Sequence, residues 1–142
     1  MKKYLTVVLI AVSFFGCASL KDFPKVVLGT STRELEAARS NSIYQDYPYK
    51  KAACFDALLR IISKNKYHVF IQDPARGLIV VMNIPNYVDT TRVGIFINEL
   101  PQGEGVRVEF SSRSTPAKRA VAKLLFGELS DFFKKQPAIK QF

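Results

Sequence analysis

The sequence LIVVM at residues 78–82 constrains the fold more than any other segment of this chain. All five side chains are apolar, so neither face of the segment is suited to water, and we expect an interior strand that is covered on both sides. Just before it, DPARG at residues 73–77 places Pro and Gly where a tight turn needs them. We therefore predict that the apolar residues 67–72 pair with 78–82 as a hairpin.

Three further strands are predicted around this hairpin. Residues 92–98 and 106–111 are rich in β-branched and aromatic side chains, and a short segment with Pro and Gly joins them. Within the second of these, apolar residues alternate with Arg107 and Glu109, which predicts one buried and one hydrated face. The remaining strand is expected at residues 43–47.

Two long segments have apolar residues at helical spacing, which predicts two helices. In residues 51–64 the apolar face is Cys54, Ala57, Leu58, Ile61 and Ile62. In residues 115–135 the residues expected to be buried are Ala117, Val121, Leu124, Leu125 and Phe132, with Leu129 a further candidate. Thr115 before Pro116 is the expected cap of this last helix, because Thr accepts from free N–H groups and Pro suits the first helical position.

A shorter helix is expected over residues 32–41, ahead of the first strand. Ser31 and Glu34 have the spacing of a capping box, and Leu35 and Ala38 are expected to face inward. The sequence thus predicts an α+β fold, in which a small, largely antiparallel sheet of about five strands carries two long helices on one face. The element order after the short helix is β-α-β-β-β-β-α.

Residues 1–17, MKKYLTVVLIAVSFFGC, combine two early lysines, an apolar run and a terminal Gly-Cys pair. The apolar run is shorter than the ~20 residues that span a bilayer, so we interpret the segment as an export signal. It resembles the signal peptides of bacterial lipoproteins, although two phenylalanines stand where that family usually has Leu and a small residue. The resemblance implies cleavage before Cys17 and attachment of lipid to its sulfur. An ordinary secretory signal cut after Ala18 is the alternative.

The lipoprotein resemblance also implies a location. Several acyl chains on Cys17 hold a protein on a membrane, because each buried methylene contributes about 0.8 kcal/mol. In lipoproteins of bacteria with two membranes, a residue such as Ala18 rather than Asp after the cysteine implies passage to the outer membrane, with the protein facing the periplasm. The predicted organisation is a signal peptide at 1–16, a lipid-anchored tether at 17–30, a single α+β domain at 31–136 and a C-terminal tail at 137–142.

The order of elements from residue 43 to residue 135 resembles the helix-grip domains of BamC, a lipoprotein of an envelope assembly machine, and similar uncharacterised exported lipoproteins. The resemblance rests on element order together with the lipoprotein-like signal that ends at Cys17. It implies the helix-grip arrangement of sheet and helices, and it transfers no active residues because it carries no catalytic motif.

The charge of the chain narrows the class of partner. The formal net charge is +9, and removal of the signal takes away two lysines. An exported basic protein rarely meets nucleic acid, so we expect a protein or an anionic envelope polymer instead. We interpret the chain as a lipid-anchored, non-enzymatic binding or assembly module of the cell envelope.

Residues with catalytic potential are few. His68 is the only histidine, and a lone histidine supplies neither a zinc site nor a catalytic triad by itself, so we expect a structural role and no metal or cofactor. With Cys17 acylated, Cys54 has no partner for a disulfide, and we expect a buried thiol, with a reactive thiol as the alternative. The carboxylates are scattered, which leaves an envelope hydrolase as a minor alternative.

The opening of the last helix is the first candidate partner-binding surface. Lys118 and Arg119 stand in its first turn, where the helix dipole favours negative charge. Arg113 comes just before the helix and Lys123 one turn later. Such a patch suits phosphate groups or an acidic partner, and a solvated face is the alternative.

The loop at residues 83–91 is the second candidate surface. Ile84, Tyr87 and Val88 are apolar, and on an exposed connection such side chains can anchor a partner. If the loop folds back, the same side chains cap one end of the core instead.

A carrier or sensor of a lipid-like ligand is the alternative function. Helix-grip arrangements can hold a lipid between the last helix and the sheet, and Phe126, Phe132 and Phe133 are the side chains that would line such a groove. The other interpretation is that these rings belong to the core.

Overall fold

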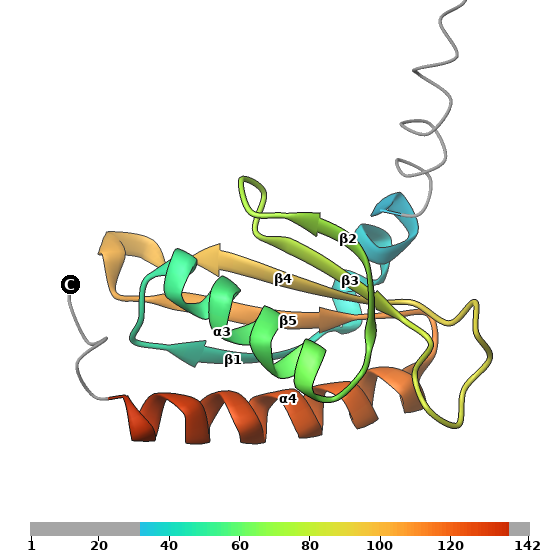
Figure 1. The fold of residues 1–142 in the computed structure, drawn as a ribbon. Coiled ribbons are helices and arrows are strands. Elements are labelled where there is room, and N and C mark those ends of the chain that lie inside the picture. The colour runs from blue at the N-terminus through green and yellow to red at the C-terminus, as the bar shows by residue number, and fades with distance from the viewer. Residues whose placement is uncertain (1–31, 137–142) are drawn as a thin grey trace, which may run out of the picture. The chain divides into compact units, whose positions relative to one another are not determined.

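The computed structural model describes residues 32–136 (Figure 1). These residues belong to one compact unit. The predicted signal peptide, Cys17, the tether, the capping residue Ser31 and the tail lie outside the described residues.

The described chain has the α+β fold that the sequence predicts. Its strands are β1 (Ile43–Tyr47), β2 (His68–Asp73), β3 (Leu78–Met82), β4 (Val93–Glu99) and β5 (Val106–Ser111). Its long helices are α3 (Lys51–Lys64) and α4 (Thr115–Lys135), with 3-10 turns η1 (Ala38–Asn41) and η2 (Pro101–Gly103). Residues 32–37 form a short α-helix that runs into η1.

The five strands form one sheet in the order β1-β5-β4-β3-β2, and every neighbouring pair is antiparallel. The turn between β2 and β3 forms as expected, because Gly77 takes φ +67° and the N–H of Arg76 donates to Asp73 Oδ1 at 3.0 Å. This hairpin makes β2 one edge of the sheet. The other edge is β1, which pairs with β5 from Ile43 opposite Phe110 to Tyr47 opposite Val106.

Strand β3 is buried on both faces, as its composition predicts. Ile79 and Val81 belong to the main core, which the sheet shares with α3 and α4. Leu78 and Val80 belong to a second, smaller cluster on the opposite face. Figure 1 shows the two helices lying along the sheet, with the short N-terminal helix at a separate place.

The short N-terminal helix covers the second face through Leu35. This side chain packs with Leu78, Val80 and Phe96, and only 3 % of its surface is exposed. Gly94 on β4 leaves the space that Leu35 needs, since a Cβ there would lie 3.2 Å from Leu35 Cδ1. The inward position predicted for Leu35 is confirmed, whereas Ala38 is only half-buried.

The hydrated face of β5 carries ion pairs, as the alternation of its residues predicts. Arg107 donates two hydrogen bonds to Asp46 on β1, at 2.7 and 2.9 Å. Arg39 of η1 donates to Glu109 at 2.9 Å and lies over the ring of Phe96. These pairs tie the edge strand and η1 to the middle of the sheet.

Two predictions about α4 are wrong in detail. Its N-cap is Ser114, whose side chain accepts from the N–H of Ala117, and Thr115 is already helical. Phe133 is buried in the core, whereas Phe132 and Leu124 are half-buried. Adjacent helical residues point about 100° apart, so a small rotation of the helix decides which phenylalanine faces the core.

None of the helices in residues 32–136 has both the length and the apolar composition needed to cross a bilayer.

We expect Gly105→Ala to destabilise the protein by about 3 kcal/mol. Gly105 has φ +132°, and a Cβ there would collide with the backbone carbonyl oxygen of Tyr47. Gly103→Ala is the matched control, because Gly103 also has positive φ but no atom lies near its added Cβ, so we expect a loss of about 1 kcal/mol. Urea unfolding of both variants measures the difference, and equal losses would contradict the collision.

Candidate functional site

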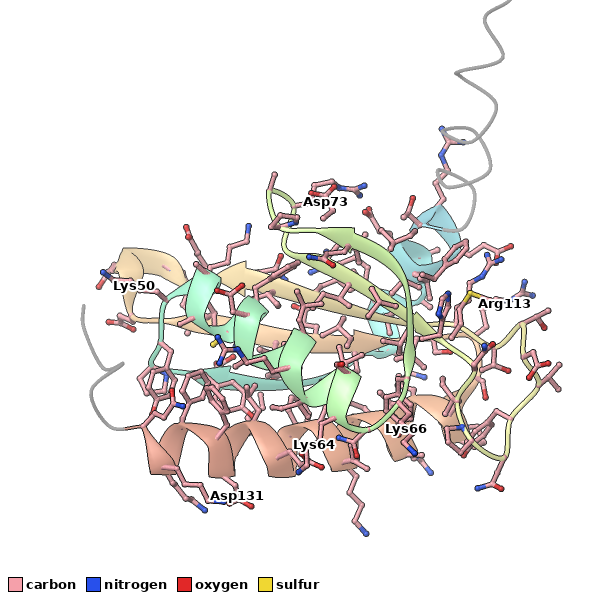
Figure 2. The ribbon with its side chains drawn as sticks, in the orientation of Figure 1. Lys50, Lys64, Lys66, Asp73, Arg113 and Asp131 are labelled. Carbon is pink, nitrogen blue, oxygen red and sulfur yellow. The ribbon has the colours of Figure 1, made fainter. Side chains whose placement is uncertain are left out.

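The described structure has a cleft at the end of the sheet where α4 begins. Its volume is about 260 Å³, and it is lined by residues 34–35, 90–92 and 112–114. We call it the α4-start cleft. Figure 2 shows Arg113 at this end of the molecule and Lys50 at the opposite end.

Hydrogen bonds hold the polar groups of the α4-start cleft in place. Ser112 Oγ donates to the carbonyl oxygen of Arg92 at 2.6 Å, which joins the start of β4 to the end of β5. Ser112 Oγ also accepts from the N–H of Ser114 at 3.1 Å. Ser114 in turn caps α4. The hydroxyl groups of Ser112 and Ser114 are therefore held between the end of β5 and the start of α4.

Two arginines and one carboxylate give the cleft its charge. The Arg92 guanidinium lies over the ring of Phe70, 4.9 Å from its centroid. The Arg113 side chain is 78 % exposed and forms a long ion pair with Glu34, at 3.5 Å between Nη1 and Oε1. An exposed pair at this distance is worth little, so Arg113 is available to another anion.

Lys118 is not part of an exposed patch, which corrects the prediction from sequence. Its residue surface is only 2 % exposed, and its ammonium donates to the backbone carbonyl oxygen of Asn41. That carbonyl lies at the end of η1, where free carbonyl groups favour a cation. Lys118 therefore joins α4 to η1, and this role explains a lysine in the first turn of a helix.

Arg119 and Lys123 are exposed, as predicted. They lie four residues apart on α4 and therefore on one side of the helix. Of the four predicted cations, the structure thus leaves three at the surface, with Arg113 in the cleft and the other two along the helix.

The loop between β3 and β4 largely folds back onto the domain. Ile84 is 3 % exposed and belongs to the main core, which corrects its prediction as a partner anchor. Tyr87 is half-buried and packs against the same core. Val88 is 71 % exposed and is the member of the three that remains a surface residue.

The aromatic rings expected to line a lipid-binding groove pack against other rings of the main core. Phe126 packs edge-on against Phe110 with 4.8 Å between ring centroids, and Phe133 stacks on Tyr49 at 3.7 Å. Phe132 lies at the edge of this cluster, with its ring 5.5 Å from that of Phe133. The interpretation as core therefore holds for Phe126 and Phe133.

The thiol of Cys54 is buried, and burial disfavours its reactive thiolate form. No part of the residue is exposed, and burial raises the pKa of the thiol to about 12. A thiolate is the nucleophilic form, so the reactive alternative is wrong at neutral pH.

His68 is exposed at the start of the edge strand β2. Within residues 32–136, no group of three or more His, Cys, Asp and Glu residues is arranged to hold a metal ion.

Carboxylate pairs line two other clefts. Asp56 and Glu99 share one, and Glu128 and Asp131 share another between α3 and α4. Glu128 accepts from Lys64 and Asn65, and these hydrogen bonds lower the pKa of its carboxyl group. A general acid needs a raised pKa, so Glu128 is poorly suited to that role. The hydrolase alternative stays a prediction.

Sequence reasoning missed most of the α4-start cleft. Arg92 and Glu34 lie far from Arg113 along the chain, and only folding brings them together. A usable signal was the hydroxyl-rich segment SSRSTP at residues 111–116, which surrounds Arg113 with donors just before a helix.

Comparison of this chain with models of known protein families gave no match. A search of curated proteins also gave no match. The function of the chain is therefore inferred from its own residues.

We expect Lys118→Met to destabilise the protein by about 2 kcal/mol, because it removes a charge-assisted hydrogen bond and leaves the Asn41 carbonyl without this donor. Lys123→Met on the same helix is the control, and its exposed position predicts a change within about 0.5 kcal/mol. Chemical denaturation measures both. Equal stability of the two variants would show that Lys118 is not a structural tie.

Proposed function

We propose that the protein is a lipid-anchored binding or assembly module of the cell envelope, which acts without catalysis on a protein or cell-wall partner. The observation that carries the proposal is the N-terminal sequence, in which a cationic start and a short apolar run end at Cys17. Its resemblance to lipoprotein signals supports an acyl anchor. Ala18 after that cysteine supports the outer membrane, with the domain in the periplasm.

The partner-binding role is supported by cations on a rigid element. Arg119 and Lys123 extend from one side of α4, a helix whose opposite side is packed into the main core. A helix fixed in this way presents its charges at a constant spacing, so little order is lost when an anionic partner binds. Arg113, just before the helix, and Val88, in the loop between β3 and β4, are further exposed candidates for partner contact.

We expect Cys17→Ala to abolish incorporation of labelled palmitate and to release the protein from the membrane fraction. The reason is that the cysteine sulfur is the proposed site of acylation, and without acyl chains the chain loses its hold on the bilayer. Cys54→Ala is the matched control and should keep both the label and the membrane fraction. A wild-type chain without label, together with unchanged fractionation of Cys17→Ala, would refute the anchor.

We expect the double variant Arg119→Glu and Lys123→Glu to reduce crosslinking of the membrane-attached protein to its partner by about tenfold, because like charges then face each other. Lys134→Glu with Lys135→Glu is the control, since these exposed lysines lie at the other end of the same helix. Partner recovery is measured by mass spectrometry after crosslinking in cells. An equal loss in both variants would show that only net charge matters and would contradict this surface.

A further inference from the structure

We propose that the α4-start cleft binds a phosphate group, the chemistry that free phosphate compounds and phospholipid headgroups share. The inference deepens the proposed function and rests on it only for the envelope as the place where the ligand is met.

Two arginines are among the described residues that line the cleft. Arg92 comes from the start of β4 and Arg113 from the link between β5 and α4, so the two approach from different elements. Guanidinium is planar and donates in pairs, which matches the oxygens of phosphate better than a lysine ammonium does. A cavity of about 260 Å³ is suited to a single small group of this kind.

The two arginines differ in how firmly they are held. Arg92 lies over the ring of Phe70, and its backbone carbonyl accepts from Ser112, so both ends of the residue are positioned. Arg113 is mostly exposed and can close over a ligand. A positioned cation on one side and an adjustable one on the other is an arrangement that can enclose an anion with little reorganisation of the core.

Hydroxyl groups complete the lining. Thr90, Thr91 and Ser114 lie in the wall of the cleft, and a hydroxyl can donate to a phosphate oxygen while it accepts elsewhere. Ser114 accepts from the N–H of Ala117, which leaves its own proton for a ligand. The lining therefore supplies neutral donors beside the two charges.

Among the described residues that line the cleft, Glu34 is the one with a carboxylate, and it competes with the proposed ligand. It lies 3.5 Å from Arg113, and both side chains are at least half exposed. A phosphate must replace this carboxylate at the guanidinium. Substitutions of Arg113 and Glu34 are therefore expected to change phosphate affinity in opposite directions. Loss of the Arg113 guanidinium weakens binding, and loss of the charge on Glu34 strengthens it.

Calorimetric titration of the full chain in nonionic detergent with inorganic phosphate, at low ionic strength and neutral pH, tests the cleft. We expect Arg113→Gln to weaken phosphate affinity about tenfold, by loss of a charge-assisted hydrogen bond. Glu34→Gln should strengthen it about threefold, by removal of a competing exposed pair. Lys50→Gln is the control for net charge, because Lys50 is exposed at the opposite end of the molecule from Arg113 (Figure 2), and the phosphate affinity of this variant should stay within about twofold of wild type.

Two arms distinguish the sources of the phosphate. Mixed micelles with phosphatidylglycerol present it as a headgroup, and micelles with diacylglycerol lack it. Binding to phosphatidylglycerol alone assigns a lipid headgroup, and binding to inorganic phosphate alone assigns a free compound. Either result supports the cleft if Arg113→Gln weakens that binding about tenfold. Thermal unfolding of each variant confirms that it is folded, which the exposure of both substituted side chains favours.

Three results would overturn the inference. These are no binding in either arm, equal weakening by Arg113→Gln and Lys50→Gln, or binding of acetate as tight as that of phosphate. None of them depends on Cys17, so failure of the cleft and failure of the lipid anchor are separate outcomes.

Discussion

The need of strand β3 for cover on both faces is the constraint on which the rest of the structure depends. All five side chains of β3 are apolar, so neither face of the strand has a polar side chain to turn toward water. Burial of each large aliphatic side chain is worth about 1.5–3 kcal/mol. The main core with α3 and α4 satisfies one face. The other face is covered by Leu35 from the helix at residues 32–37, so this short segment is part of the folded domain. Ser111 strengthens the contact by donating to the carbonyl oxygen of Leu35 at 2.5 Å.

The same packing creates the α4-start cleft. Once Leu35 is fixed against the sheet, the preceding Glu34 is carried to the end of β5, where it meets Arg113. The end of η1 is likewise carried to α4, where Lys118 donates to it. Apolar burial thus brings an acidic residue, two arginines and several hydroxyl-bearing residues to one cleft, although none of these polar residues provides the main driving force for folding.

Neighbouring cations on α4 illustrate how position decides between structure and binding. Lys118 and Arg119 are adjacent and carry the same charge, yet the first is buried against η1 and the second is exposed. The helix rotates about 100° per residue, so one side chain points to the domain and the next to solvent. The broken rule at the start of the helix, a cation near the positive end of its dipole, therefore has a structural explanation for Lys118. It leaves Arg119, Lys123 and Arg113 for the proposed contact with an anionic partner.

The amino-acid sequence alone determined the type and order of the elements, because alternation, helical spacing and turn residues such as Gly77 act over short distances along the chain. It could also place the core face of α3, since that period is regular. Only the tertiary structure decided that β1 pairs with β5, that the N-terminal helix covers the second face, that Ile84 is core, and which polar residues share a cleft. These features depend on contacts between residues far apart in the chain. Such contacts are set by how whole faces fit together, and no local pattern of residues encodes that fit.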